Sequence, residues 1–195
     1  MARRSDHDDR RRQLGRAVWR VVRSQGVSAL TVRRVGQEAG WTSGAVQYYF
    51  ASRNALLEYA FQLVQQQTLD RLAAVAETAG DEEAARTAFH QVLPSSDEVR
   101  AEAEVWFSFL GLALGDPGLR EVGRKGQRIV IDAIAAAVGR SQRAGVISRD
   151  LDPQMVAVEG IALADGLCVN AMYHPVRLKE GDVVGLFDRW LAALR

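Results

Sequence analysis

The spacing of apolar residues is the strongest constraint on how this chain can fold. Along most of the 195 residues, apolar side chains recur every three or four positions, which is the period of an α-helix with one buried face. The alternation of apolar and polar residues that is typical of a half-buried β-strand is absent. All four prolines follow residue 90 and fall between the periodic segments, where they would interrupt helices. The sequence therefore predicts an all-α protein.

Capping residues and helix breakers divide this pattern into nine helices. Thr31, Thr42 and Ser52 are residue types that cap helix N-termini, and Gly40 is a residue type that ends helices. The nine predicted helices are Arg10–Gln25, Val32–Ala39, Ser43–Tyr49, Asn54–Thr78, Glu82–Val92, Asp97–Leu114, Leu119–Arg143, Pro153–Tyr173 and Glu180–Leu194.

Charge is distributed unevenly along the chain, although the formal net charge is only +1. Residues 1–57 contain eleven arginines and four acidic residues, a formal charge of +7, whereas residues 58–195 carry −6. A basic segment on an acidic body predicts an anionic partner for the first part of the chain only. Arginine-rich codon usage is a simpler explanation for the arginines, but it does not explain why their excess is segregated.

Two short predicted helices, Val32–Ala39 and Ser43–Tyr49, have the spacing of a helix-turn-helix. In that arrangement the second helix stands away from the first, so that its N-terminal turn can enter a DNA major groove about 12 Å wide. Val46 and Phe50 give the second helix an apolar face, and polar residues occupy the opposite face. The spacing alone fits any two-helix corner equally well.

A series of residue types at fixed offsets begins at Gly26 and continues past this helix pair. Its members are Gly26, Thr31, Ala39-Gly40, Thr42, Gly44, Tyr48-Tyr49-Phe50, Ser52-Arg53 and Leu56-Leu57. The series resembles the DNA-binding signature of the TetR family of transcriptional regulators. A later stretch, VEGIALADGLCVNAMYHPVRL at residues 158–178, is similar to the BetI-like branch of that family. The resemblance implies a DNA-binding domain at residues 1–53, with a disordered tail at 1–9, and a helical effector-binding and dimerisation domain at residues 54–195.

The resemblance also implies which residues meet DNA. Those expected to hold the phosphate backbone, which positions a protein without specifying sequence, are Thr31, Thr42, Tyr48, Tyr49 and Arg53. Arg33 and Arg34, on the first helix of the pair, could add phosphate contacts. Those expected where the second helix comes closest to the bases are Ser43, Gly44, Ala45 and Gln47.

Several residues in this region depart from the family pattern or keep another interpretation open. Gln47 replaces the commoner Tyr and is suited to hydrogen bonding with adenine. Trp41 replaces the usual Val and is expected to pack under the turn. Tyr49 could instead be a core ring, and each arginine a solvated surface charge. The arginines of the N-terminal tail could enter a minor groove or stay in solvent; they are Arg3, Arg4, Arg10, Arg11 and Arg12.

The predicted helix Asp97–Leu114 is apolar nearly all round, so its side chains must fill a core or line a cavity. Since TetR-like proteins bind small effectors in this part of the chain, we expect a mostly apolar pocket with a few polar anchors. The candidate ligand-binding residues are Phe89, Trp106, Phe109, Leu110, Ile129, Met155, Glu159 and Asp165. Glu159 and Asp165 could attract a cationic ligand, face solvent or pair across a dimer.

The last two predicted helices carry broad apolar faces. By resemblance they form a four-helix bundle with their copies from a second chain, and the expected interface residues are Val158, Ile161, Ala162, Leu167, Val183, Phe187, Trp190, Leu191 and Leu194. A two-fold dimer would match a pseudo-palindromic operator. The alternative is that both helices pack within their own chain.

Residues that could support catalysis are not grouped. The three histidines are scattered, and Cys168, the one cysteine, lies on an apolar helix, which is typical of a buried thiol. The motifs HExxH, GxSxG and CxxC are absent. Gly118 to Gly123 has the spacing of a phosphate-binding loop, but Arg124 follows it and no predicted strand precedes it. We therefore expect no enzymatic activity, no metal and no cofactor.

Together these features predict a homodimeric transcriptional regulator that binds double-stranded DNA at a pseudo-palindromic operator. We expect a repressor that a small-molecule effector releases from DNA. The charged N-terminus has no apolar run behind it, and no stretch of about 18 uncharged apolar residues occurs, so we expect no membrane contact and a bacterial, cytoplasmic location, on the nucleoid when bound to DNA. The alternative is an all-helical interaction module that does not bind DNA.

Overall fold

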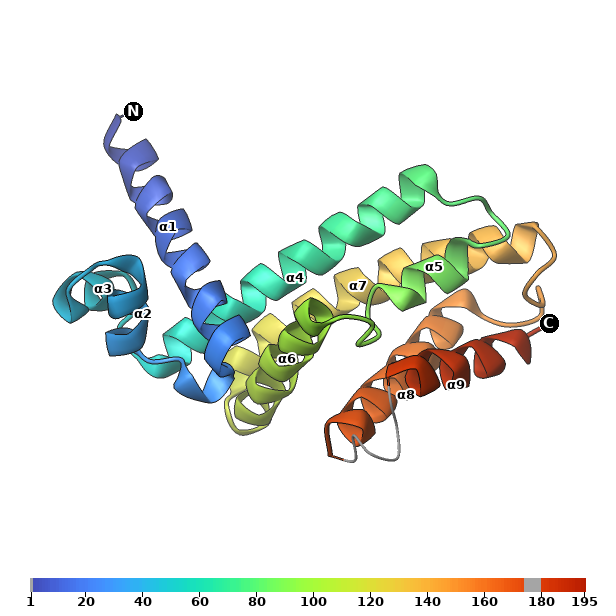
Figure 1. The fold of residues 1–195 in the computed structure, drawn as a ribbon. Helices are drawn as coiled ribbons and strands as arrows, with labels where there is room; N and C mark the ends of the chain where they lie inside the picture. The colour runs from blue at the N-terminus through green and yellow to red at the C-terminus, as the bar shows by residue number, and fades with distance from the viewer. Residues whose placement is uncertain (1, 174–179) are drawn as a thin grey trace. The chain divides into compact units, whose positions relative to one another are not determined.

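The computed structural model describes residues 2–173 and 180–195, and within these ranges the chain forms nine α-helices, one 3₁₀ turn and no strand (Figure 1). The elements are α1 Ala2–Gln25, η1 Val27–Ala29, α2 Val32–Ala39, α3 Ser43–Tyr49, α4 Arg53–Thr78, α5 Ala84–His90, α6 Asp97–Gly115, α7 Pro117–Arg143, α8 Pro153–Tyr173 and α9 Glu180–Ala192. The predicted all-α fold is confirmed. The expected helix stop at His174-Pro175 lies outside the described residues.

The predicted capping residues start and end the N-terminal helices. Thr31, Thr42 and Ser52 each accept a hydrogen bond from the backbone N–H three residues on, at 3.1–3.2 Å. Gly40 ends α2 in the left-handed conformation, with φ of 71°, which a residue without Cβ adopts at little cost. These local contacts explain why the predicted bounds of α2 and α3 agree with the structure.

Three helices begin earlier than predicted, and for α4, which starts at Arg53 rather than Asn54, the difference is a single residue. The first helix starts at Ala2 rather than Arg10, so the tail expected to be disordered is helical. Residues 2–9 contain no Gly or Pro that would break the helix. An ion pair between Asp9 and Arg12 joins successive turns. The seventh starts at Pro117, because Asp116 caps it by accepting hydrogen bonds from two following N–H groups. The glycines from residue 118 to 123 are therefore helical and form no phosphate-binding loop.

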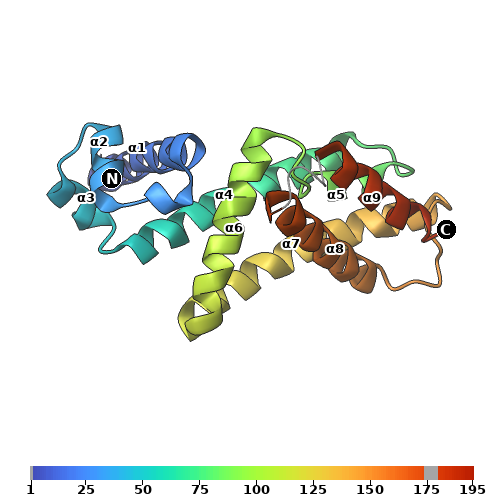
Figure 2. The same ribbon diagram turned by 60° about the horizontal axis from the view of Figure 1, so that its bottom comes forward.

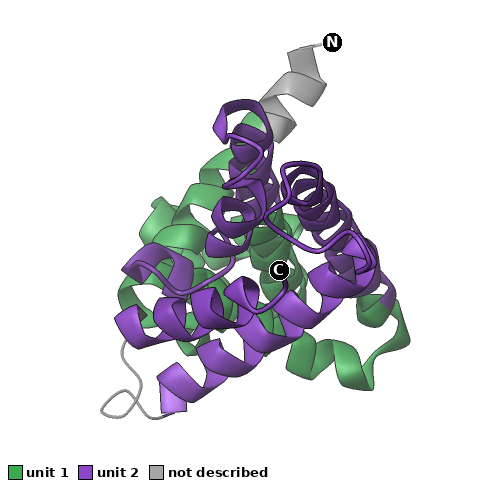
Figure 3. Cartoon of the chain, turned by 90° about the vertical axis from the view of Figure 1, so that its right-hand side faces the viewer, with its two compact units in different colours: residues 1–65, 101–120 green, residues 66–100, 121–195 purple. Residues whose placement is uncertain are grey.

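The chain forms two compact units, coloured separately in Figure 3. Unit 1 comprises residues 1–65 and 101–120, and unit 2 comprises residues 66–100 and 121–195. Helix α4 contributes its first half to unit 1 and its second half to unit 2. The division into functional domains at residues 53 and 54 remains a prediction.

Aromatic packing fills the core of unit 2. Phe89 of α5 is fully buried, with its ring centroid 5.0 Å from that of Phe187 and 5.7 Å from that of Trp190, both on α9. Gly160 brings α8 against this cluster: a Cβ atom there would lie 2.3 Å from the Phe89 ring and 2.9 Å from Trp190. Helices α8 and α9 lie side by side (Figures 1 and 2) because this glycine allows so close an approach.

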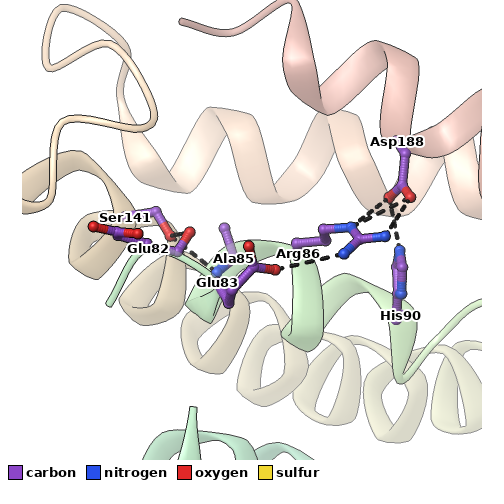
Figure 4. A network of polar contacts seen from close by, with 7 residues as sticks. All are labelled: Glu82, Glu83, Ala85, Arg86, His90, Ser141 and Asp188. Atoms are coloured by element: carbon purple, nitrogen blue, oxygen red, sulfur yellow. Dashed lines mark hydrogen bonds and ion pairs between the residues drawn. The ribbon is translucent and has the colours of Figure 1, made fainter. Parts of the chain in front are cut away.

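A polar network ties α5 to its neighbours in unit 2 (Figure 4). Asp188 of α9 accepts hydrogen bonds from Arg86 at 2.9 Å and from His90 at 2.7 Å. Burial alone would raise the pKa of Asp188, but the hydrogen bonds from Arg86 and His90 outweigh it and hold that pKa below its ordinary value. On the other side, the buried hydroxyl of Ser141 accepts from the N–H of Ala85 at 3.1 Å. The short helix α5 is thus fastened to both α7 and α9.

Arg140 of α7 holds the C-terminal end of α4. Its guanidinium donates to the carbonyl of Ala76 at 3.0 Å and to the carbonyl of Ala79, and it pairs with Asp81 at 2.7 Å. The last carbonyls of a helix have no partner within the helix and carry partial negative charge, which a cation stabilises. The far end of α4 is therefore anchored within unit 2.

One helix in the described ranges, α8, has the length and apolar composition that a membrane-spanning helix requires. Only 28% of its most apolar window is buried within the chain. Core helices of soluble proteins meet the same criteria, so length and composition do not by themselves indicate a membrane span. The low buried percentage does establish that α8 exposes apolar surface.

The close approach at Gly160 gives a stability prediction. Gly160→Ala should lower the free energy of unfolding by roughly 1–3 kcal/mol, because the new methyl group forces the Phe89 ring out of its position. Urea or thermal unfolding of the purified protein measures this. Gly139→Ala on α7 is the control, because its Cβ would meet only the mobile end of Arg143 at 3.7 Å. Equal stability of the two variants would contradict the packing described here.

Candidate functional site

The first three helices form a small cluster within unit 1, which we call the head (residues 9–50). An ion pair of 2.7 Å between Arg20 and Glu38 joins α1 to α2. The turn between α2 and α3 is tight, because a Cβ on Gly36 would lie 2.8 Å from the carbonyl oxygen of Trp41. The N–H of Trp41 donates to the carbonyl of Gly36 at 2.8 Å. The angle between the two helices is therefore set by direct backbone contact.

Helix α3 has one buried and one exposed face. Val46 is fully buried and Phe50 nearly so, which confirms that this pair attaches the helix to the head. On the opposite side Gln47 is exposed, and Tyr48 presents 79% of its surface to solvent. The Tyr48 ring is therefore accessible to a binding partner.

The first turn of α3 is open as well. Ser43 and Gly44 are exposed and Ala45 is half-buried. The backbone N–H groups of a first helical turn have no partner within the helix, apart from those that the cap satisfies. Small side chains here would let a ligand approach the helix N-terminus closely.

Tyr49 is half-buried, so it is neither a core ring nor a fully outward one. Its ring packs edge-on against Trp41, with centroids 5.8 Å apart, and against Tyr48 at 5.2 Å. Trp41 is itself half-buried and supports Tyr49 through this edge-on ring contact.

The predicted phosphate-binding arginines are open to solvent. Arg33, Arg34 and Arg53 are exposed, and Arg53 donates to the carbonyl of Val27 at 3.4 Å in the free protein. Thr31 and Thr42 use their side-chain oxygens to cap α2 and α3, but each hydroxyl keeps a hydrogen that it can donate. The eleven predicted DNA-binding residues thus lie on or around α2 and α3, and their contacts with DNA stay a prediction.

The tail arginines lie on the extended first helix. Arg10, Arg11 and Arg12 are exposed on α1, whereas the side chains of Arg3 and Arg4 lie outside the described residues. A helix with its side chains is about 10–12 Å across, whereas a minor groove is about 6 Å wide. The helix itself is therefore too wide for a minor groove, and only its arginine side chains could enter one.

The structure separates the predicted ligand-binding residues into several environments. In unit 1, Phe61 of α4 stacks on Phe109 with ring centroids 4.0 Å apart and on Trp106 at 5.8 Å, and Leu110 is half-buried. In unit 2, Phe89 is a core residue with no exposed surface and packs against Phe187 and Trp190, so its role in ligand binding stays a prediction. The remaining four are more open: Ile129, Met155 and Glu159 are exposed, and Asp165 is half-buried.

Glu102 is a buried acid on the apolar helix α6 that the sequence analysis did not select. Glu102 of α6 is only 4% exposed. It lies one turn before Trp106 and two turns before Phe109, so all three share a helix face. This spacing was available as a signal in the sequence, but an acid near a helix N-terminus reads equally well as an exposed residue.

A cavity of about 280 Å³ lies elsewhere in unit 2, beside the polar network of α5. Its walls include Arg86, Ser141 and Asp188, which already satisfy one another or the nearby backbone. It contains none of the predicted ligand-binding residues.

The predicted interface residues also need correction. Val183, Phe187 and Leu191 form the buried side of α9 in the chain's own core, so they cannot contact a partner. The reason is that α9 turns this face toward Phe89. Those that keep exposed surface are Val158, Ile161, Ala162, Leu167, Trp190 and Leu194.

The chain is similar to known regulators over almost its entire length. Residues 16–60 match the family described as bacterial regulatory proteins, tetR family, and residues 81–195 match the C-terminal domain of BetI-type transcriptional repressors. The HTH-type transcriptional regulator PksA of Bacillus subtilis is 28% identical, and the alignment covers 94% of this chain and 88% of PksA. The regulator BetI of Cronobacter sakazakii is 25% identical over 83% of this chain and 79% of BetI. A transcriptional regulator from Saccharomonospora viridis, solved in complex with choline, is 22% identical and superposes with a TM-score of 0.82, covering 94% of this chain and 96% of that one.

Proposed function

The chain belongs to the TetR family of bacterial transcriptional regulators, and from this premise we propose that it binds its operator through the exposed face of α3. The observation that carries the proposal is the division of α3 into two faces. Val46 and Phe50 hold the helix to the head, while Gln47 and Tyr48 point to solvent on a small, arginine-rich unit. A helix held in this way can enter a major groove without unfolding the head.

The exposed residues divide into two roles in this proposal. Ser43, Ala45 and Gln47 face base edges, where Ala45 can contact a thymine methyl and Gln47 can pair with an adenine. The threonine hydroxyls, the tyrosines and the arginines around them hold phosphates, and these contacts make affinity fall steeply with salt. Arg53 would exchange its bond to the Val27 carbonyl for a charged phosphate, which is a stronger acceptor.

A second copy of the chain covers α8 in this proposal. The support is that α8 exposes apolar surface, including Val158 at 41%, and that only about a quarter of its apolar window is buried in the single chain. Water-exposed apolar surface of this extent is typical of an association site. A two-fold dimer presents two copies of α3 to major grooves about one helical turn of DNA apart.

The proposed effector is a small cation of the choline type. A solved relative of this fold contains choline. In unit 1 of this chain, the carboxyl group of Glu102 is buried on the same helix face as Trp106 and Phe109. Aromatic faces and a carboxylate together are the groups that recognise a quaternary ammonium ion. The acids selected from the sequence, Glu159 and Asp165, are less buried and suit this role less well.

The effector then acts by shifting a population. It favours a conformation in which the two heads of the dimer no longer match successive major grooves, and so it lowers operator affinity. Helix α4 runs through both units and is the connecting element. Repression relieved by the effector, a cytoplasmic location and the absence of enzymatic activity are parts of the same proposal.

The exposed face of α3 gives a binding prediction. Gln47→Ala should weaken binding to the operator by about tenfold to a hundredfold, because one bidentate base contact is lost. Selection of genomic fragments by the purified protein identifies the operator, and fluorescence anisotropy measures the affinity. Gln62→Ala, an exposed glutamine on α4, is the matched control and should leave affinity unchanged. The proposed DNA-binding role of α3 is wrong if the two variants bind the operator with equal affinity.

The proposed effector gives another binding prediction. Glu102→Gln should raise the dissociation constant for choline at least about tenfold, because a buried carboxylate no longer faces the cation. Calorimetry with choline and with its uncharged carbon analogue, 3,3-dimethylbutan-1-ol, measures the contribution of the charge. Glu159→Gln, at an exposed acid, serves as the control. Equal affinity of the wild type for choline and the analogue would contradict a cation site.

A further inference from the structure

We propose that Tyr59, through its contacts with α1 and with the end of α3, is the positioning residue that holds the DNA-binding head on α4. The inference rests on the proposed function, because it concerns how α4 reaches the surface that meets DNA. All the contacts involved lie within unit 1.

Tyr59 contacts α1 in two ways. Its hydroxyl donates to the carbonyl oxygen of Arg11 at 3.2 Å, and the guanidinium carbon of Arg11 lies 5.0 Å from the centre of its ring. The hydrogen bond is directional, and the cation over the ring adds attraction. Burial raises the pKa of Tyr59 although the charge of Arg11 lowers it, so the hydroxyl keeps its hydrogen and remains a donor.

A glycine in the middle of α1 makes room for this contact. Gly15 is buried, and a Cβ atom there would lie 2.9 Å from the Tyr59 hydroxyl and 3.3 Å from the ring carbon Cε1. Glycine inside a helix is unfavourable by about 1 kcal/mol relative to alanine. The close fit of Tyr59 is the structural reason for a glycine at this position.

The same ring also touches the proposed reading helix. Phe50, the C-terminal cap of α3, is 3% exposed, and its ring centroid lies 4.9 Å from that of Tyr59. One side chain of α4 therefore contacts both α1 and the end of α3. A movement of α4 that displaces Tyr59 breaks a hydrogen bond on one side and shifts a packed ring on the other.

The test uses two substitutions, one on each side of the contact between Gly15 and Tyr59. Gly15→Ala should strengthen α1 if only helix propensity matters. Because the new methyl group displaces Tyr59, we expect instead that Gly15→Ala weakens operator binding by about tenfold and speeds amide hydrogen exchange in α1 and α3. Tyr59→Phe removes only the hydroxyl and should accelerate exchange in α1 around Arg11, with the ring still packed on Phe50.

The double variant distinguishes positioning from general destabilisation. Adding Tyr59→Phe to Gly15→Ala removes the atom nearest to the new methyl group, so part of the lost operator affinity should return. Gly160→Ala, which disturbs only the core of unit 2, is the control for lowered stability. Additive effects in the double variant, or exchange rates in Tyr59→Phe equal to those of wild type, would overturn the inference. Failure of the wild type to bind any duplex would instead refute the proposed function, and the exchange measurements would still report on Tyr59.

Discussion

The burial of Val46 and Phe50 is the interaction on which the proposed DNA surface depends. A helix of seven residues is too short to be stable alone, so packing of one face must hold α3 in place. Once these two side chains are buried, the period of the helix turns Gln47 and Tyr48 toward solvent. The cap at Thr42 and the backbone contact beneath Trp41 then fix the direction in which the helix points. The exposed chemistry is a consequence of the packing.

Helix α4 carries the second part of the account. Near its start, Tyr59 contacts α1 and the end of α3. At its other end, Arg140 donates to the carbonyl of Ala76 in the last turn of the helix and to that of Ala79 just beyond it, within unit 2. Both ends are thus joined to their surroundings by directional polar contacts. A helix held at both ends can transmit a displacement that a helix free at one end would absorb.

Local signals in the sequence predicted most of the fold, and long-range packing accounts for what they did not predict. The caps at Thr31 and Thr42 depend on neighbours three residues away, so the sequence locates α2 and α3 well. The apolar residues of α9 recur with a spacing that predicts burial of Val183 and Phe187. That spacing is the same whether they pack against Phe89 of their own chain or against another chain. Likewise, the burial of Glu102 depends on α6 being covered along that face, which no local pattern records.

The central claim is that the exposed face of α3 is the surface that meets DNA, and two tyrosines allow a direct measurement of it. Tyr48 on α3 is 79% exposed, so hydroxyl radicals should oxidise it readily in the free protein, and Tyr173 in unit 2 is the internal reference, because it lies outside the proposed DNA surface. Radical footprinting with mass spectrometry reads both sites in one sample. When operator DNA is added, oxidation of Tyr48 should fall severalfold while that of Tyr173 stays constant. Unchanged oxidation of Tyr48 in a complex that demonstrably contains operator would contradict the account.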